Sequence, residues 1–175
     1  KIEFWDALLD EVGDVVDIIR FGDDLGMDSG PFMSPGIYRE LFKPRHRQLF
    51  QYVKENSSMK VFLHSCGSIY RLLPDLVEIG LEIVNPVQTQ SFEMDEVRLK
   101  EEFGDKLTFW GGGADTRRIL HSGTPGEVRA DVLRRCEIFA PGGGFVWNTI
   151  HNITPDVPPQ NIIAMFDAVR EFNGS

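Results

Sequence analysis

Apolar and polar positions alternate along the chain in a pattern that predicts five strands, each followed by a helix. Short apolar runs that end in polar or glycine residues predict strands at 17–21, 59–63, 81–84, 106–110 and 145–147. Longer stretches with apolar residues three or four positions apart predict helices near 1–15, 34–56, 69–79, 94–103, 124–139 and 158–169. Such an alternation of strands and helices is typical of a parallel sheet covered by helices.

Local residue patterns indicate where two of these helices begin and where one of them is interrupted. Ser34 is a good N-terminal cap and Pro35 suits the first helical position, whereas Pro44 predicts a kink or a break inside the same helix. Thr124, with Glu127 three positions later, forms a capping-box pattern. Residues 27–35, which precede the helix predicted from Ser34, are expected to be loop.

The composition is that of a globular domain. The chain has 175 residues, of which 42% are hydrophobic and 26% are charged, so it can bury a core as a single domain spanning residues 1–175. Its formal net charge is −9, which makes nucleic acid and anionic membrane surfaces poor partners. No apolar run approaches the roughly 20 residues that a membrane span needs.

Two further features bear on where the chain belongs. It shows no signal peptide and has only two cysteines, which favours a cytoplasmic protein in a reducing environment. It begins at Lys1 inside a helical pattern, without an initiating methionine, so we expect it to be a piece of a longer protein.

Polar, acidic and metal-binding side chains gather just after the predicted strands. In parallel α/β folds ligands bind at the carboxyl ends of the strands, so these side chains predict a functional site at that edge. The candidates are Asp23, Asp24, His64, Cys66, Asn85, Gln88, Asp115, Asn148 and His151. The opposite ends of the strands carry ordinary turn residues.

The motif His64-Ser65-Cys66 is the sharpest of these signals. Residues two apart in an extended chain point to the same side, so an imidazole and a thiol can reach one point, and this pair suits zinc. A buried strand with a polar end is the simpler alternative. A second alternative is a cysteine nucleophile activated by His64, but the sequence identifies no oxyanion hole or orienting group for it.

Other candidates also have structural interpretations. Asp23 and Asp24 can form a turn by bonding their own backbone, and His151 can cap the last helix or be buried. Residues 111–113 are three glycines without a phosphate-binding pattern, which favours close approach of the backbone to a ligand or a neighbouring loop.

Three residues with reactive side chains are expected to lie outside the site. Cys136 falls on the apolar face of a predicted helix and is expected to be buried as a small hydrophobic residue. His46 and His121 have no partner in the sequence and are expected to be solvated.

An ordered set of motifs resembles the uroporphyrinogen decarboxylase superfamily, which includes the decarboxylase and corrinoid-dependent methyltransferases. The motifs are Gly22-Asp23-Asp24-Leu25-Gly26, Leu63-His64-Ser65-Cys66-Gly67-Ser68, Gly80 through Asn85-Pro86-Val87-Gln88, Phe109-Trp110-Gly111-Gly112, Ala140-Pro141-Gly142-Gly143-Gly144, His151 and Pro155-Asp156-Val157-Pro158-Pro159. The resemblance covers essentially the whole chain. It implies the C-terminal portion of a (β/α)8 TIM barrel, with about five β/α units present; a whole barrel takes about 250 residues.

The resemblance leaves two branches open. The methyltransferases of the superfamily bind zinc through a His-x-Cys pair and a later cysteine; His64 and Cys66 match the pair, and His151 stands where that cysteine would be. The decarboxylases use no metal and place a histidine in a Gly-His-Gly setting after the last strand. His151 resembles that histidine, but Ile150 and Asn152 depart from its setting.

We therefore expect a zinc-dependent methyltransferase that acts with a corrinoid on a partner protein and with a thiol or folate substrate. The resemblance implies zinc on the catalytic residues His64, Cys66 and His151. The side chains expected to orient the small-molecule substrate, or groups around the metal, are Asp24, Asn85, Gln88, Asp115 and Asn148. The relatives also suggest a homodimer. The alternatives are metal-free uroporphyrinogen decarboxylation and an inactive fragment or binding module.

Overall fold

The computed structural model describes the backbone of residues 2–174 and the side chains of residues 4–174, so Lys1 and Ser175 lie outside the described part. Within this part a parallel sheet has the order β1-β4-β5-β6-β7. Its strands are β1 (Ile18–Gly22), β4 (Lys60–His64), β5 (Ile83–Asn85), β6 (Thr108–Trp110) and β7 (Phe145–Val146). The predicted α/β architecture of five successive units is confirmed, with β1 and β7 at the two edges.

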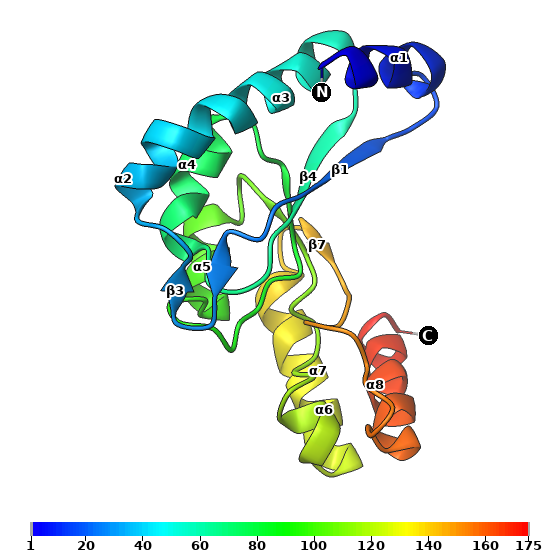
Figure 1. Ribbon diagram of the computed structural model, residues 1–175. Helices are drawn as coiled ribbons and strands as arrows, with labels where there is room; N and C mark the ends of the chain where they lie inside the picture. The colour runs from blue at the N-terminus through cyan, green and yellow to red at the C-terminus, as the bar shows by residue number, and fades with distance from the viewer. Residues whose placement is uncertain (1, 175) are drawn as a thin grey trace.

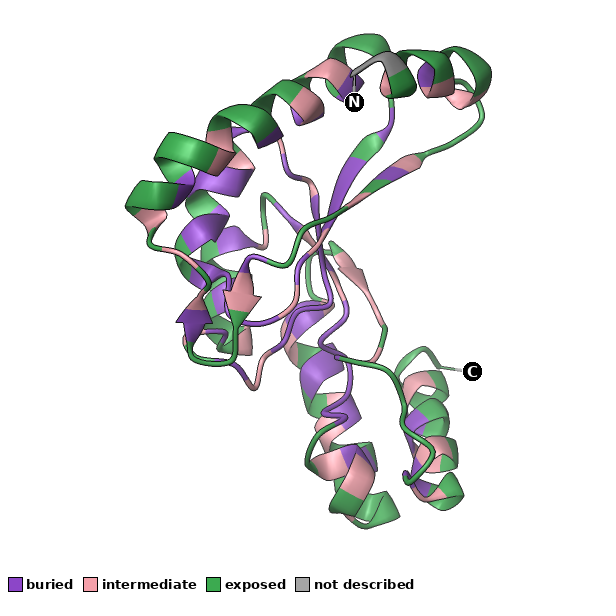
Figure 2. Ribbon diagram, viewed as in Figure 1, coloured by how far each residue is buried: buried purple, intermediate pink, exposed green. Residues whose placement is uncertain are grey.

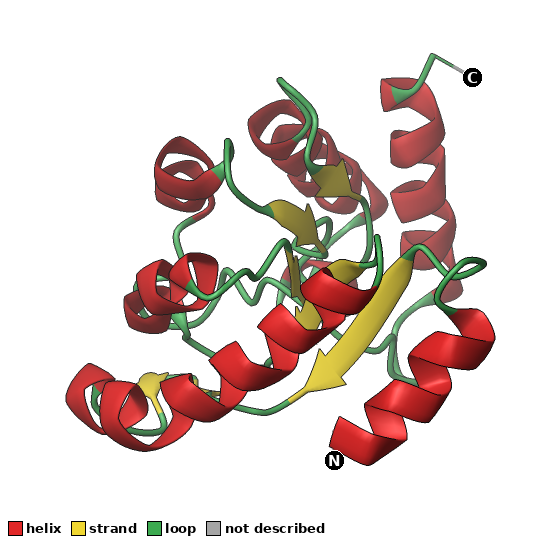
Figure 3. Cartoon of the chain, turned by 90° about the horizontal axis from the view of Figure 1, so that it is seen from above, coloured by secondary structure: helices red, strands yellow, loops and turns green. Residues whose placement is uncertain are grey.

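Helices separate the strands and lie around them when the molecule is seen from above (Figure 3). The longer ones are α1 (Ile2–Val12), α3 (Lys43–Asn56), α4 (Leu73–Glu78), α5 (Glu96–Phe103), α7 (Pro125–Phe139) and α8 (Pro159–Phe172). Helices α3, α4 and α5 lie on one side of the sheet, whereas α7 and α8 run side by side as a second group (Figure 1).

The register of the strands aligns the candidate residues. Gly22 of β1 pairs with His64 of β4, and His64 pairs with Asn85 of β5, so the three residues form one row across the sheet. The segments that follow these three residues therefore all leave the sheet at the carboxyl end of the strands. Parallel pairing thus brings together residues that are more than 60 positions apart in the chain.

Proline breaks the helix predicted over 34–56, as expected. The chain forms α2 (Pro35–Ile37), then a π-helical turn η1 (Tyr38–Phe42), and then α3. Pro44 has no backbone N–H to donate to the preceding turn, and the N–H of Lys43 instead reaches the carbonyl of Tyr38 in a wide i→i+5 bond. One extra residue is thereby accommodated in this turn.

Several elements differ from the sequence prediction. The predicted loop over 27–35 contains a short antiparallel hairpin, β2 (Gly26–Met27) and β3 (Gly30–Pro31). The short helix α6 (Ile119–Ser122) was not predicted, and the helix predicted at 69–79 begins with the 3₁₀ turn η2 (Tyr70–Leu72). The strands predicted from 81 and 106 start two residues later, at Ile83 and Thr108.

Buried residues follow the strands and the inward faces of the helices (Figure 2). One apolar cluster joins α3, α4 and α5 to the sheet, with Phe50, Leu76 and Phe109 fully buried. A second cluster joins α6, α7 and α8, around Val132 and Met165. The packing of the first cluster sets the positions of the strands that carry the candidate site.

None of the helices among residues 2–174 is both long enough and apolar enough to cross a membrane.

Candidate metal site and its surroundings

Three side chains converge at the carboxyl ends of β1 and β4. One ligand atom each from Asp24, His64 and Cys66 lies within 4.8 Å of the other two. The Sγ atom of Cys66 is 3.6 Å from Nε2 of His64, and the backbone N–H of Cys66 donates to Oδ1 of Asp24 at 2.9 Å. Nitrogen, sulfur and carboxylate oxygen are the ligand types that zinc takes in proteins.

The spacing of this cluster suits a tetrahedral ion. Bonds of about 2.0–2.1 Å to nitrogen and about 2.3 Å to sulfur, set at the tetrahedral angle, place the two ligand atoms about 3.6 Å apart. The observed separation of His64 Nε2 and Cys66 Sγ is 3.6 Å. The separation of these two atoms therefore matches that of two ligands on one tetrahedral zinc ion.

Asn85 fixes which nitrogen of His64 is free to bind a metal. Its Nδ2 group donates to the carbonyl of Trp110 at 2.8 Å, so its Oδ1 atom must be the one that faces Nδ1 of His64 at 2.6 Å. Because Oδ1 only accepts, Nδ1 carries the proton, and the lone pair of Nε2 points toward Cys66. This is the support that metal-binding histidines receive from a neighbouring polar group.

The thiol of Cys66 is held in its protonated form when no cation is present. Burial raises its pKa, and the charge and hydrogen bonding of Asp24 raise it further, while the charge of Arg117 acts in the opposite direction. A metal ion at the cluster reverses this balance, because it outweighs the carboxylate as the largest local charge and stabilises the thiolate.

Backbone bonds hold the two loops that carry the cluster. The N–H of Asp23 donates to the carbonyl of His64 at 3.0 Å, and the N–H of Leu25 donates to Oγ of Ser65 at 3.0 Å. The amide oxygen of Gln88, which is buried, accepts from the N–H of Gly67. Gln88 therefore positions the Cys66 loop from the next strand along the sheet.

A cavity of about 250 Å³ opens beside the cluster. Its lining includes His64, Cys66 and Asn85 together with Asn148 and His151. The sequence prediction that residues 64, 66, 85, 148 and 151 meet at one edge of the sheet agrees with this arrangement. The segment that carries Asn148 reaches the cavity because its carbonyl accepts from Gly113 at 2.8 Å, beyond the end of β7.

The third ligand differs from the one we expected. His151 is exposed and lines the cavity, but it does not belong to the group of ligand atoms gathered within 4.8 Å among the described residues; Asp24 takes that place. Asp24 follows β1, which pairs directly with β4, whereas His151 lies in the loop after β7 at the other edge of the sheet. His151 thus lines the cavity without joining the cluster.

Asp115 has a structural position. It is buried, and its Oδ1 atom accepts from the backbone N–H groups of Arg117 and Arg118 at 3.0 and 2.9 Å, while its own N–H donates to Asp131. It does not line the cavity of the cluster. Its bonds shape the loop after β6, so the expectation that it contacts substrate gains no support from its position.

The β2–β3 hairpin is tied across the same edge of the sheet. The guanidinium of Arg117 binds both carboxylate oxygens of Asp28 at 2.8 Å, and Ser91 donates to the same carboxylate at 3.2 Å. Arg117 lowers the pKa of Asp28, and Ser91 contributes to the same shift. The hairpin therefore joins the loops that follow β5 and β6. It also contacts the loop of Cys66, because the N–H of Ser68 donates to the carbonyl of Met27.

The structure also places the residues that were expected to lie outside the site. Cys136 is buried in the second apolar cluster, as predicted, and His121 is partly exposed and pairs with Asp156 at 2.7 Å. The prediction that His46 is solvated is wrong, because it is 8% exposed and bonded to Tyr38 and Asp23. Asp23 therefore does not serve as a simple turn former.

The glycines after β6 allow close approach of the backbone, as predicted. A Cβ atom on Gly111 would collide with the carbonyl of Pro86, and one on Gly113 would lie 2.5 Å from the indole nitrogen of Trp147. Arg135, which the sequence did not indicate, supports the same loop by donating to the carbonyl of Gly112 at 3.1 Å, and it also donates to Asp131 at 2.8 Å.

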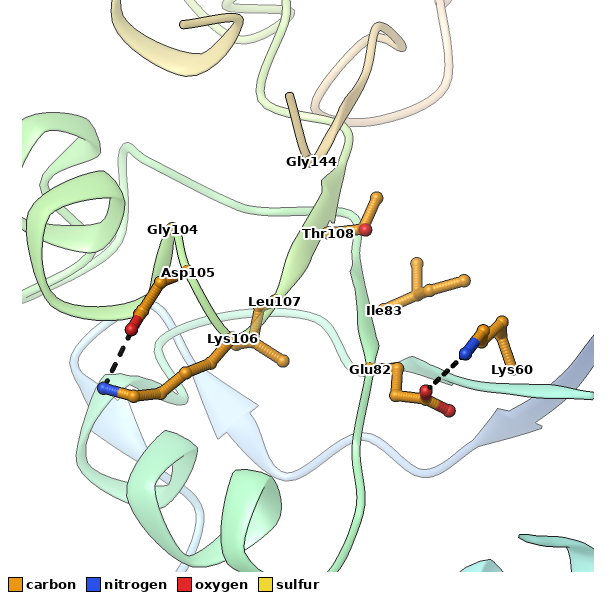
Figure 4. Close-up of a pocket in the computed structure, with 9 residues that line it drawn as sticks. All are labelled: Lys60, Glu82, Ile83, Gly104, Asp105, Lys106, Leu107, Thr108 and Gly144. Atoms are coloured by element: carbon orange, nitrogen blue, oxygen red, sulfur yellow. Dashed lines mark hydrogen bonds and ion pairs between the residues drawn. The ribbon is translucent and has the colours of Figure 1, made fainter. Parts of the chain in front are cut away.

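Another cavity, of about 330 Å³, lies at the amino ends of the strands (Figure 4). Its charged side chains are paired with one another, Lys60 with Glu82 at 3.0 Å and Lys106 with Asp105 at 3.6 Å. Because this cavity opens at the end of the sheet opposite His64, it does not contribute to the candidate site.

Comparison with known proteins gives the class of the fold. The chain aligns with a methyltransferase from Methanosarcina mazei with a TM-score of 0.66 at 23% identity, over 90% of this chain and 42% of that one. At this identity the likeness defines the fold alone. The five parallel β/α units are thus part of a (β/α)8-type barrel, with the candidate metal site at the carboxyl ends of its strands.

The sequence profile of the uroporphyrinogen decarboxylase (URO-D) family matches residues 2–172, and the chain belongs to this family. The uroporphyrinogen decarboxylase of Pseudoalteromonas translucida is 40% identical over 74 residues, which are 42% of this chain and 20% of that protein. That of Chlorobium phaeobacteroides is 26% identical over 145 residues, which are 79% of this chain and 38% of that protein. The chain therefore spans well under half the length of the relatives it matches.

Proposed function

We propose that this chain forms the zinc-binding part of a methyltransferase that acts with a corrinoid protein and a thiol or folate substrate. The observation that carries the proposal is the cluster of Asp24, His64 and Cys66 at the carboxyl ends of neighbouring strands. Asp24 replaces His151 as the third ligand in this proposal. A bound zinc ion supplies Lewis acidity, which lowers the pKa of a thiol and makes it nucleophilic near neutral pH.

The protein side chains have distinct tasks in this proposal. Nε2 of His64, Sγ of Cys66 and the carboxylate of Asp24 hold the ion, and Asn85 keeps the proton of His64 on Nδ1. Asn148 and His151 line the same cavity as the cluster and would orient a substrate that enters there. Three protein ligands leave one position of a tetrahedral ion for that substrate.

Metal-free uroporphyrinogen decarboxylation is the second candidate. The relatives reported above carry that activity in their names, and the family match covers nearly the whole chain. The geometry favours the first candidate, because a decarboxylase has no need of a thiol and an imidazole brought within 3.6 Å of each other beside a carboxylate.

Two assays on the purified protein separate the candidates. Under our proposal, zinc-loaded protein transfers a methyl group between methylcobalamin and a small thiol, and a chelator abolishes the transfer while added zinc restores it. The reaction is followed by the visible spectrum of the corrinoid. Decarboxylation of uroporphyrinogen that persists in the presence of the chelator would select the second candidate instead.

Absence of both reactions would favour the third hypothesis, a binding module or an inactive fragment. The two edge strands of the described sheet, β1 and β7, are consistent with that outcome, because each has a strand partner on one side only. Zinc binding without either reaction would retain the metal site and reject the catalytic part of the proposal.

A further inference from the structure

A chain of hydrogen bonds, buried at Tyr38 and His46 and exposed at Asp23, lies next to the metal cluster and is not used in the function proposed above. The hydroxyl of Tyr38 is 3.1 Å from Nδ1 of His46, and Nε2 of His46 is 3.0 Å from Oδ2 of Asp23. Tyr38 is fully buried and His46 is 8% exposed. The ring of His46 stacks on Phe50 at 5.8 Å between centroids and 5° between planes, so its orientation is fixed.

The direction of these bonds follows from the groups at the two ends. An ionised carboxylate only accepts, so Nε2 of His46 donates to Asp23. In neutral imidazole Nδ1 then accepts, and the hydroxyl of Tyr38 supplies the proton; burial raises the pKa of Tyr38, which keeps it a donor. Every polar atom of the His46 ring thus has a partner.

The π-helical turn explains why residues eight positions apart can meet. In a regular α-helix of about 3.6 residues per turn, positions 38 and 46 would differ by about 80° around the axis. The wide turn over Tyr38–Phe42 takes up one additional residue, so the offset is close to that of seven residues, or two full turns. The wide turn therefore places Tyr38 and His46 on one face.

This chain of bonds ends one residue before a metal ligand. Successive side chains of an extended segment point to opposite sides, so Asp23 reaches outward to α3 while Asp24 points inward to Cys66. The backbone is also bonded to the loop of Cys66 on both sides of Asp24. The N–H of Asp23 donates to the carbonyl of His64, and the N–H of Leu25 donates to Oγ of Ser65. Holding the side chain of Asp23 on the helix side therefore fixes the direction of the Asp24 carboxylate.

We propose that Tyr38, His46 and Asp23 are positioning residues that set the metal affinity of the cluster by fixing Asp24. This inference rests on the zinc site of the proposed function. Loss of the brace leaves the Asp24 carboxylate held by the N–H of Cys66 without support from the helix side, so we expect the effect on metal affinity. Outer partners of this kind change metal affinity by about 10–100-fold when they are removed.

The test compares three substitutions of His46 in the purified protein. His46→Gln places a donor near the position of Nε2 and keeps the bond to Asp23, whereas His46→Asn offers a polar group only near Nδ1, and His46→Leu offers neither. We expect zinc affinity to fall about 10–100-fold in His46→Leu and His46→Asn and to stay near the native value in His46→Gln. Zinc affinity is measured by competition with a chromophoric chelator.

The melting temperature of each metal-free variant is measured together with its zinc affinity. A merely structural role would lower the melting temperature and leave the zinc affinity of the folded protein unchanged. Asp23→Leu, which is of similar size but cannot accept the bond from His46, serves if His46→Leu does not fold, and its affinity should also fall. Equal zinc affinity in the native protein and all folded variants would overturn the inference alone. Failure of the native protein to bind zinc would overturn the proposed metal site together with it.

Discussion

Replacement of His64 by alanine is expected to reduce bound zinc from about one ion per chain to a trace. The substitution removes the only imidazole in the cluster and leaves a carboxylate and a thiol whose pKa is raised by burial and by Asp24. A zinc site with two protein ligands, one of them protonated near neutral pH, cannot compete with buffer for the ion. Elemental analysis of the purified variant measures the loss.

His121→Ala is the matched control for this experiment. His121 is partly exposed at α6 and pairs with Asp156 rather than with the cluster, so its removal should leave zinc content unchanged. Full zinc content in His64→Ala would contradict the assignment of this residue, and a parallel loss in His121→Ala would place the metal elsewhere on the chain.

Gly67→Ala is expected to destabilise the protein more than any other glycine substitution tested beside it. Gly67 has a φ of +78°, and a Cβ there would lie 2.5 Å from the carbonyl carbon of Gly26, which is backbone and cannot rotate away. The left-handed conformation costs an alanine about 1–2 kcal/mol. The collision between the two loops adds about 1–3 kcal/mol.

Gly142→Ala isolates the two contributions. Gly142 has a φ of +76°, nearly that of Gly67, but nothing lies within 4 Å of its Cβ position. It should therefore lose only the conformational part, about 1–2 kcal/mol of the free energy of unfolding. Denaturant titration of both variants measures the difference. Equal losses would show that the loops after β1 and β4 can separate without cost.

Much of the fold could be predicted from the sequence, because it depends on short-range signals. The capping box forms as expected, with Oγ1 of Thr124 accepting from the N–H of Glu127 and the carboxylate of Glu127 accepting from the N–H of Thr124. Pro44 interrupts its helix for the same local reason. Strand boundaries were less accurate, since pairing depends on where the neighbouring strand begins.

The edge of the sheet that holds the site was also predictable, whereas the roles of its residues were not. Polar residues after each strand indicate the edge, but the register decides that Asn85 supports His64 and that Asp24, rather than His151, joins the cluster. The bond between Asp23 and His46 depends on the rotation of a helix around a widened turn, which no spacing rule in the sequence encodes.

The most direct test of the metal site is the zinc X-ray absorption spectrum of the purified native chain. Our account predicts one sulfur ligand at about 2.3 Å, with the remaining ligands nitrogen or oxygen at about 2.0–2.2 Å. The sulfur is that of Cys66, because Cys136, the second of the two cysteines, is buried in the cluster between α7 and α8. A spectrum without sulfur, with two protein sulfurs, or with no bound zinc at all would contradict it.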